Sequence, residues 1–209
     1  MRKFILVPLV VWSLSCTILA SEIREFDIRT IERLGNELTR VSQTADHGAT
    51  TPVRKRAQQT AEAALQGKLF NVRYEYVVLD DPDGNGFLVY ALARGSKRGD
   101  VGVHGHFRVG VSADGTQARR IDALSHSVDI ENRYADPSPA GYQRVVFVTS
   151  QTVGTRPLET LVYASNLMNL RFVVATLPDG QAWRIQNGKI HKVTKAEQEA
   201  AEREEQKKK

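Results

Sequence analysis

The spacing of apolar residues in the first part of the chain predicts two helices. Between residues 21 and 46, apolar side chains recur every three or four positions and charged side chains fill the positions between them. This spacing places Ile23, Phe26, Ile31, Leu34, Leu38 and Val41 along one face of an amphipathic helix. A second helix is expected over residues 52–67, because Thr51 is a favourable N-cap and Pro52 suits the first helical position.

After Gly67 the pattern changes to an alternation of apolar and polar residues, which is typical of β-strands. Residues 70–78 and 87–92 flank the turn sequence DDPDGNG and predict a β-hairpin. Residues 132–141 contain two prolines and a glycine and are expected to form a long loop. Further strands are predicted at residues 101–112, 117–123, 144–150, 159–164, 171–175 and 182–186. The segment over residues 158–170 could instead be helical, and a strand followed by a turn is the preferred interpretation. Helices followed by strands predict an α+β fold, with N-terminal helices packed on an antiparallel β-sheet meander.

The N-terminal segment has the pattern of a secretory signal peptide. Arg2 and Lys3 precede an apolar run over residues 4–14, and Ala20 is small enough for a cleavage position. The apolar stretch is shorter than the roughly 20 residues that a membrane-spanning helix needs. We therefore expect residues 1–20 to be a signal peptide cleaved near Ala20. The mature chain would be periplasmic or secreted, with no transmembrane domain after cleavage.

Two alternatives to this cleavage stay open at the level of the sequence. One is retention of the apolar segment as a membrane anchor. The other is a lipoprotein with lipid attached to Cys16, which is disfavoured because Leu14 lies one position too near the cysteine for a normal lipobox. Cys16 is the only cysteine in the chain. A single cysteine excludes a disulfide within the chain and a zinc site built from cysteines.

Length and composition fit one globular domain between two terminal segments. The 209 residues are 41% hydrophobic and 25% charged, which excludes a collagen-like or wholly disordered chain. From residue 194 to residue 209 the chain carries no large apolar residue. Residues 192–209 are therefore expected to be a charged tail, helical or disordered, and residues 21–191 a single α+β domain.

The basic character of the chain resides mainly at its ends. The formal net charge is +5, of which Arg2 and Lys3 supply two charges and residues 192–209 one more. Residues 21–191 are left with a net charge of +2, and no basic stripe with interleaved aromatic residues occurs among them. The sequence therefore predicts no nucleic-acid partner.

The turn between the two predicted hairpin strands resembles the start of a calcium-binding loop. Asp81, Asp83 and Asn85 occupy alternate positions, from which oxygen atoms can converge on one cation. The twelfth position, which normally supplies a bidentate Glu, is Leu92, and a strand replaces the exit helix. Because Asp-Gly and Asn-Gly sequences form hairpin turns without a metal, a plain turn is favoured over calcium binding.

Two histidines make a second candidate metal site. His104 and His106 alternate along a predicted strand, so both would lie on one face, where two imidazoles can bind zinc or copper. His126 and His191 are distant in the sequence, and no third ligand follows nearby. We therefore expect neither a metal nor a cofactor. The candidate ligands, should a metal bind, are His104, His106, Asp81, Asp83 and Asn85.

Hydroxyl and carboxylate groups offer weaker catalytic candidates. The run Ser125-His126-Ser127 sets hydroxyls beside an imidazole, but neighbouring residues on a strand point to opposite faces. No nucleophile-elbow pattern is present, and neither Asp122 nor Asp129 makes a convincing third member of a triad.

Paired carboxylates could support acid–base chemistry. The two pairs are Asp80 with Asp83 and Asp129 with Glu131. Both pairs occur in turn-like or edge sequences, where solvated carboxylates are the usual case. The sequence therefore identifies no catalytic residue.

Three segments carry a resemblance to a known group of proteins. They are YEYVVLDDPDGNGFLVYAL, GHFRVGVSADGTQARRIDALS and RPLETLVYASNLMNLRFVVATLPDGQAWRIQNGKI. Over residues 26–190 the chain resembles uncharacterised exported proteins of proteobacteria, which have no assigned activity. The resemblance implies an exported, periplasmic domain and transfers no catalytic residue.

The functional expectation is an exported envelope protein that acts as a non-enzymatic binding or accessory module. Its partner would be an envelope protein or a small ligand. The alternative is an envelope hydrolase or a metal-dependent enzyme that uses His104, His106 and the turn from Asp80 to Asp83. An enzyme of this kind must bring at least three of these polar groups together at one cleft.

Overall fold

The computed structural model describes residues 23–134, 146–194 and 196–197, and it confirms the α+β fold class. The predictions for residues 1–20, for Cys16, for most of the loop at 132–141 and for most of the tail lie outside the described residues. The helices are α1 (Ile28–Val41), α2 (Pro52–Ala64) and α3 (Glu159–Met168). The strands are β1 (Arg73–Asp80), β2 (Phe87–Arg94), β3 (Asp100–His104), β4 (Phe107–Val111), β5 (Ala118–Ala123), β6 (Asp129–Asn132), β7 (Val146–Gln151), β8 (Arg171–Thr176), β9 (Gln181–Gln186) and β10 (Lys189–Lys192).

Both N-terminal helices form where the apolar pattern predicts them, but α1 is shorter than expected. It begins after Asp27, whose carboxylate accepts a hydrogen bond from the Thr30 amide at 2.9 Å. This cap fixes the start, so Ile23 and Phe26 precede the helix while still packing against the core. The second helix is capped by Thr51 with Pro52 at its first position, as the sequence predicts.

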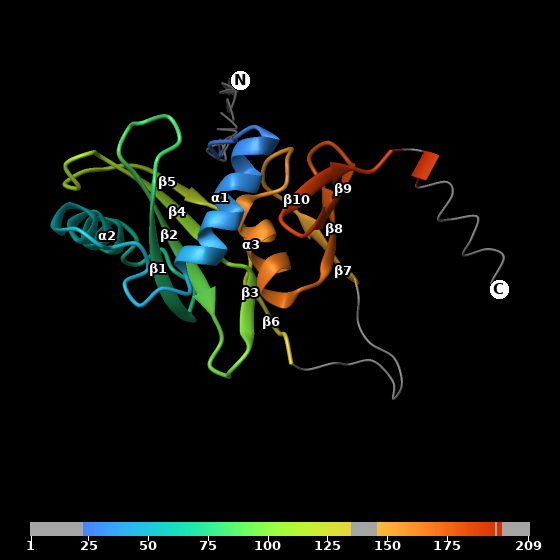
Figure 1. Ribbon diagram of the computed structural model, residues 1–209, viewed down its shortest axis with the longest axis horizontal. Helices are drawn as coiled ribbons and strands as arrows, with labels where there is room; N and C mark the ends of the chain where they lie inside the picture. Colours follow the sequence, from blue (N-terminus) through green and yellow to red (C-terminus); the bar gives the residue numbers. More distant parts are fainter. Residues whose placement is uncertain (1–22, 135–145, 195, 198–209) are drawn as a thin grey trace, which may run out of the picture.

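The predicted hairpin of β1 and β2 is confirmed, and it lies in a four-stranded sheet with order β1-β2-β4-β5. Alternate residues of this sheet face two separate apolar clusters. Val78, Val89 and Val109 belong to the cluster under α2, whereas Val77 and Tyr90 belong to the cluster with α1 and α3. Both faces of the sheet are therefore covered by helices, α2 on one side and α1 with α3 on the other (Figure 1).

The second four-stranded sheet has the order β10-β9-β8-β7, and one of its pairs departs from an antiparallel meander. Strands β7 and β8 run parallel, and α3 connects them. The prediction of a strand at residues 159–164 is therefore wrong. A parallel pair of strands needs a crossover connection, and α3 supplies it. Because α3 is buried on nearly all sides, its sequence lacks the spacing of an amphipathic helix.

The single strand predicted over residues 101–112 is divided into two. Gly105 has a φ of +93°, a conformation that glycine adopts easily, and it separates β3 from β4. After this break β4 joins the first sheet, whereas β3 pairs with β6 as a separate two-stranded ladder. The strands β6 and β10 were not predicted.

The two helices α1 and α3 cross at Gly35. A Cβ atom at this position would lie 2.4 Å from the Val162 Cβ and 2.7 Å from the Glu159 carbonyl oxygen. We expect Gly35→Ala to lower the free energy of unfolding by about 1–3 kcal/mol, because the helices would have to separate. The higher helix propensity of alanine, worth about 1 kcal/mol, offsets only part of this loss. Urea unfolding measures the difference.

A matched glycine provides the control for this experiment. At Gly110 in β4, the nearest atom to an added Cβ is the Arg120 Cβ at 3.8 Å, an ordinary contact distance. Gly110→Ala is expected to leave stability unchanged or slightly raised. Equal effects of the two substitutions would show that close helix packing at Gly35 does not matter.

Candidate functional site

The described residues surround a polar pocket with a volume of about 320 Å³, which we call the His104 pocket. It is lined by residues from β3, β6 and β7 and from the segment between β5 and β6. All but one of the lining residues are polar; they are His104, Leu124, Ser125, Ser127, Asp129, Thr149, Ser150, Gln151 and Thr152. Hydroxyl groups, an imidazole and a carboxylate thus line one pocket.

His104 is positioned in the pocket by strands that are distant in the sequence. Its backbone pairs with Asp129 across the β3–β6 ladder, and its ring Nε2 lies 2.8 Å from the hydroxyl oxygen of Thr149 on β7. Burial lowers the pKa of His104, and the charge of Asp129 acts in the opposite direction. Burial also raises the pKa of Asp129. The pocket therefore presents a neutral imidazole, which can both donate and accept a hydrogen bond.

Ser125 supports the wall of the pocket rather than acting as a nucleophile. Its hydroxyl oxygen accepts a hydrogen bond from the Gly105 amide at 2.7 Å and donates one to the Ser127 carbonyl at 2.8 Å. These bonds fix the break between β3 and β4 against the segment that follows β5. The adjacent His126 is exposed and does not line the pocket, so the structure does not form the Ser125–His126 pairing considered from the sequence.

His106 does not share a site with His104. The prediction that the two rings lie on one strand face is wrong, because the strand breaks at Gly105 between them. The Nδ1 atom of His106 accepts a hydrogen bond from the Ala93 amide at 3.0 Å, and Nε2 lies 3.1 Å from the Gly102 carbonyl oxygen. Both ring nitrogens are thus used in binding backbone, and the side chain is buried.

The candidate calcium loop is a hairpin turn held by an arginine. The Arg24 guanidinium donates to both carboxylate oxygens of Asp81 at 2.8 Å and to Asp83 at 2.5 Å. This contact lowers the pKa of Asp81. A positively charged side chain thus lies against the carboxylates that a cation would need. Asn85 contributes its backbone carbonyl, which accepts a hydrogen bond from Arg119 at 3.2 Å.

The remaining carboxylate candidates fall into different surroundings. Asp80 forms an ion pair with Arg54 beside α2, away from Asp83, whose partner is Arg24. Asp129 lines the His104 pocket, whereas Glu131 does not line it. Within the described parts of the chain, no three His, Cys, Asp or Glu side chains are grouped as metal ligands.

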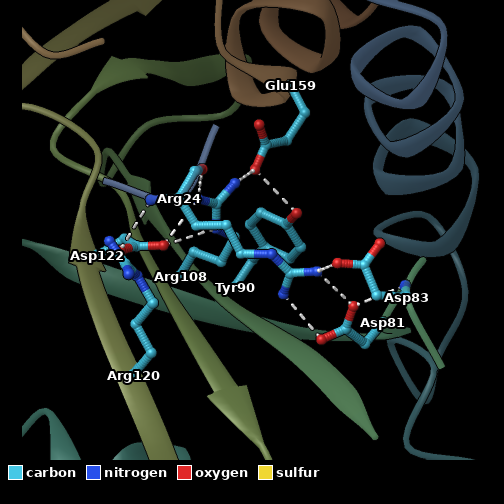
Figure 2. A network of polar contacts seen from close by, with 8 residues as sticks. All are labelled: Arg24, Asp81, Asp83, Tyr90, Arg108, Arg120, Asp122 and Glu159. Carbon is cyan, nitrogen blue, oxygen red and sulfur yellow. Dashed lines mark hydrogen bonds and ion pairs between the residues drawn. The ribbon is translucent and has the colours of Figure 1, made fainter. Parts of the chain in front are cut away.

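The structure contains a buried network of polar contacts centred on Arg108 (Figure 2). The sequence pattern does not predict this network. Tyr90, Arg108 and Asp122 lie next to one another across β2, β4 and β5. The Arg108 guanidinium is 1% exposed and donates to Asp122 at 2.7 Å and to Glu159 at 2.5 Å. The Tyr90 hydroxyl donates to the same Glu159 carboxylate at 2.9 Å. Glu159 is the first residue of α3, so the network fastens this helix to the sheet.

The chain segment before α1 completes this network. The Arg24 carbonyl accepts a hydrogen bond from Arg108. The centre of the Phe26 ring lies 4.7 Å from the guanidinium carbons of both arginines. Burial opposes the charge of Arg108, but the carboxylates of Glu159 and Asp122 outweigh it and raise the pKa of Arg108. The only sign of this network in the sequence is an arginine in an otherwise apolar strand.

Two other cavities are formed by groups that already have structural partners. One, of about 490 Å³, lies between the end of α1 and β1, and its Arg54 donates to the backbone carbonyls of Gly48 and Val78. The other, of about 190 Å³, lies beside Arg24, which is bound to Asp81. Of these three cavities, the His104 pocket is the one lined by an imidazole, and we take it as the better candidate for a ligand.

Comparisons of the chain with protein-family models, with curated proteins and with solved structures found no match. The resemblance to exported proteobacterial proteins thus stays a prediction. Among the helices of the described residues, none is long and apolar enough to cross a membrane.

Proposed function

We propose that the chain is an exported envelope protein that acts as a binding or accessory module and takes a small polar ligand in the His104 pocket. The observation that carries this proposal is that His104, Asp129 and Thr149, from three different strands, line the same polar pocket. The signal-peptide pattern of residues 1–20 supports export.

The chemistry of the lining indicates the class of ligand. A volume of about 320 Å³ suits a small molecule. The hydroxyls of Ser127 and Thr152 and the neutral ring of His104 offer donors and acceptors. Among the described residues that line the pocket, Leu124 alone is apolar. A small ligand that is rich in hydroxyl, amide or amino groups fits this lining, whereas an extended apolar ligand does not.

A binding role is favoured over the enzymatic alternative by the positions of the candidate groups. His104 lines the pocket, His106 binds backbone, and Asp81 and Asp83 bind Arg24. These groups have separate partners and are not gathered at one cleft. We therefore assign His104 to recognition of the ligand and assign no catalytic residue.

Ligand screening tests this proposal. Amino acids, dipeptides and monosaccharides serve as probes in thermal-shift assays, with titration calorimetry for those that raise the melting temperature. We expect at least one probe to bind, and His104→Phe to weaken its binding by about tenfold or more, because both ring nitrogens are lost and polar groups of ligand and pocket are left unpaired.

His126→Phe is the matched control, because His126 is exposed and lies outside the pocket lining. The His126→Phe variant is expected to bind the same probe with the affinity of the unmodified chain. Binding that is equally strong in His104→Phe, or the failure of every probe to bind, would contradict a ligand role for this pocket.

A further inference from the structure

The side chains that line the His104 pocket give it an uneven charge. Asp129 is the one carboxylate among the described lining residues, and none of these residues is a lysine or an arginine. The other ionisable group is the imidazole of His104, which is neutral because burial lowers its pKa. Within the described residues, the lining therefore has the negative charge of Asp129 and no positive charge to balance it.

The Asp129 carboxylate lies on the same side of the β3–β6 ladder as the His104 ring. The two residues are directly opposed in this antiparallel pair, so their side chains are cross-strand neighbours on one face. The His104 ring extends from that face to the hydroxyl of Thr149, which also lines the pocket. The negative charge of the pocket is thus next to its imidazole.

The Asp129 carboxylate has no partner of its own among the described residues. The structure gives it neither a hydrogen bond nor an ion pair there, whereas the carboxylate of Asp81 is bound by Arg24. Burial raises the pKa of Asp129, His104 opposes this effect, and the like charge of Glu131 adds to it. A partly buried carboxylate without a counter-charge is unfavourable for the fold, and exceptions of this kind are typical of functional sites.

Further polar groups without partners line the same pocket. The hydroxyls of Ser127, Ser150 and Thr152 form no hydrogen bond with another described residue. The Nδ1 atom of His104 has no such bond either, since the ring contacts Thr149 through Nε2. A hydroxyl can accept as well as donate, and a neutral imidazole accepts through one of its nitrogens. The pocket therefore offers several acceptors beside one negative charge.

We infer that the His104 pocket selects a small organic cation with an ammonium group, and that Asp129 confers this selectivity. The inference rests on the proposed function and names the class of ligand. An ammonium group has three donors and no acceptor, so it can pair with the carboxylate and donate to hydroxyls of the lining. A ligand with a carboxylate or phosphate group is disfavoured, because it would meet the like charge of Asp129.

A metal ion fits this pocket less well than an organic cation does. In the part of the chain that the structure describes, no three His, Cys, Asp or Glu side chains are grouped as metal ligands. One carboxylate and one imidazole supply fewer ligands than protein sites for zinc or calcium normally do. The volume of about 320 Å³ also suits a small molecule.

Three sugars that differ in charge test the inference. Glucosamine, glucose and glucuronate share a hexose ring with hydroxyl groups, but they carry an ammonium group, no charge and a carboxylate, respectively. Titration calorimetry of the full chain, slightly below neutral pH so that the amine is largely protonated, measures their affinities. We expect glucosamine to bind about tenfold more tightly than glucose, because it gains a charge-assisted hydrogen bond, and glucuronate to bind more weakly than either.

Asp129→Asn tests which residue is responsible. The substitution keeps the size of the side chain and removes its charge. We expect it to weaken the binding of glucosamine by about tenfold and to leave the binding of glucose nearly unchanged, because only the ammonium group loses its counter-charge. The melting temperature of this variant should equal or exceed that of the unmodified chain, because the carboxylate that is removed has no partner in the fold.

Glu131→Gln is the matched control. Glu131 lies on the same strand as Asp129 and has the same charge, but it does not line the pocket. This variant is expected to keep the preference for glucosamine over glucose, with its folding verified by its melting temperature.

The possible outcomes separate this inference from the proposed function. If glucose or glucuronate binds at least as tightly as glucosamine, and His104→Phe weakens that binding, the inference is overturned while the proposed function stands. A preference for glucosamine that persists in Asp129→Asn also overturns the inference. If none of the three sugars binds, the inference is overturned, and the wider set of probes decides whether the pocket takes any ligand.

Discussion

Replacement of Arg108 by methionine is expected to lower the free energy of unfolding by about 3–5 kcal/mol. The substitution keeps much of the side-chain volume but removes the positive charge between Asp122 and Glu159, both of which are at most 4% exposed. Glu159 would retain only the Tyr90 hydroxyl as a partner within this network. A buried carboxylate without its counter-charge is costly, so the loss should be large compared with the 5–15 kcal/mol that stabilises a typical domain. Urea unfolding at pH 7 measures it.

Two further variants make the origin of this loss identifiable. Arg119→Met removes an exposed arginine from β5, whose guanidinium donates to the Asn85 carbonyl, and is expected to change stability by no more than about 0.5 kcal/mol. The double variant Arg108→Met with Glu159→Gln should recover part of the loss, because no charge is then left on residue 159. A double variant that is less stable than Arg108→Met would show that lost packing, rather than the buried charge, dominates.

Acidification from pH 7 to pH 5 is expected to lower the free energy of unfolding by about 2 kcal/mol through His106 alone. Burial lowers the pKa of His106 to about 3, whereas a histidine in the unfolded chain has a pKa near 6.5. Within this window the unfolded state gains a proton that the folded state does not bind. Stability therefore falls as the pH falls below about 6.5, with a slope approaching 1.4 kcal/mol per pH unit. His104, whose pKa is also lowered, acts in the same direction.

The comparison that isolates this effect is His106→Asn against His126→Asn, which alters an exposed histidine. Free energies of unfolding at pH 7 and pH 5 give the pH dependence of each variant. The His106 variant should be less stable at pH 7, since it loses bonds to Ala93 and Gly102, but its stability should depend less on pH. A pH dependence identical to that of the unmodified chain would exclude His106 as the titrating group.

Prediction from sequence worked where one local rule decides the structure. Pro52 after Thr51 determines where α2 begins, and the Asp-Gly and Asn-Gly turn between alternating strands determines the first hairpin. The preferred interpretation of residues 159–164 as a strand failed at α3, and the helical alternative was right, because a helix buried on nearly all sides lacks the spacing by which amphipathic helices are recognised. Prediction also failed at Gly105, where a single positive φ separates β3 from β4.

The candidate site shows the same division. The sequence presents His104 and Asp129 in different constellations, and it gives no sign that Thr149 belongs with them. They come together because β3 pairs with β6 and because β7 is brought beside them through its parallel pairing with β8. Contacts between residues tens of positions apart leave no local pattern, so the sequence could supply the residue types but not their grouping.

The sequence by itself determined the α+β class, the two N-terminal helices, the hairpin and the concentration of basic charge at the chain ends. These features depend on periodicity, capping and composition, which act over a few neighbouring residues. Tertiary structure alone decided that Arg24 lies against Asp81, that Arg108 is buried between two carboxylates and that His106 binds backbone. Each of these features depends on contacts between segments that are distant in the sequence. A charged or polar side chain is buried and meets its partner only when the helices and sheets have packed together.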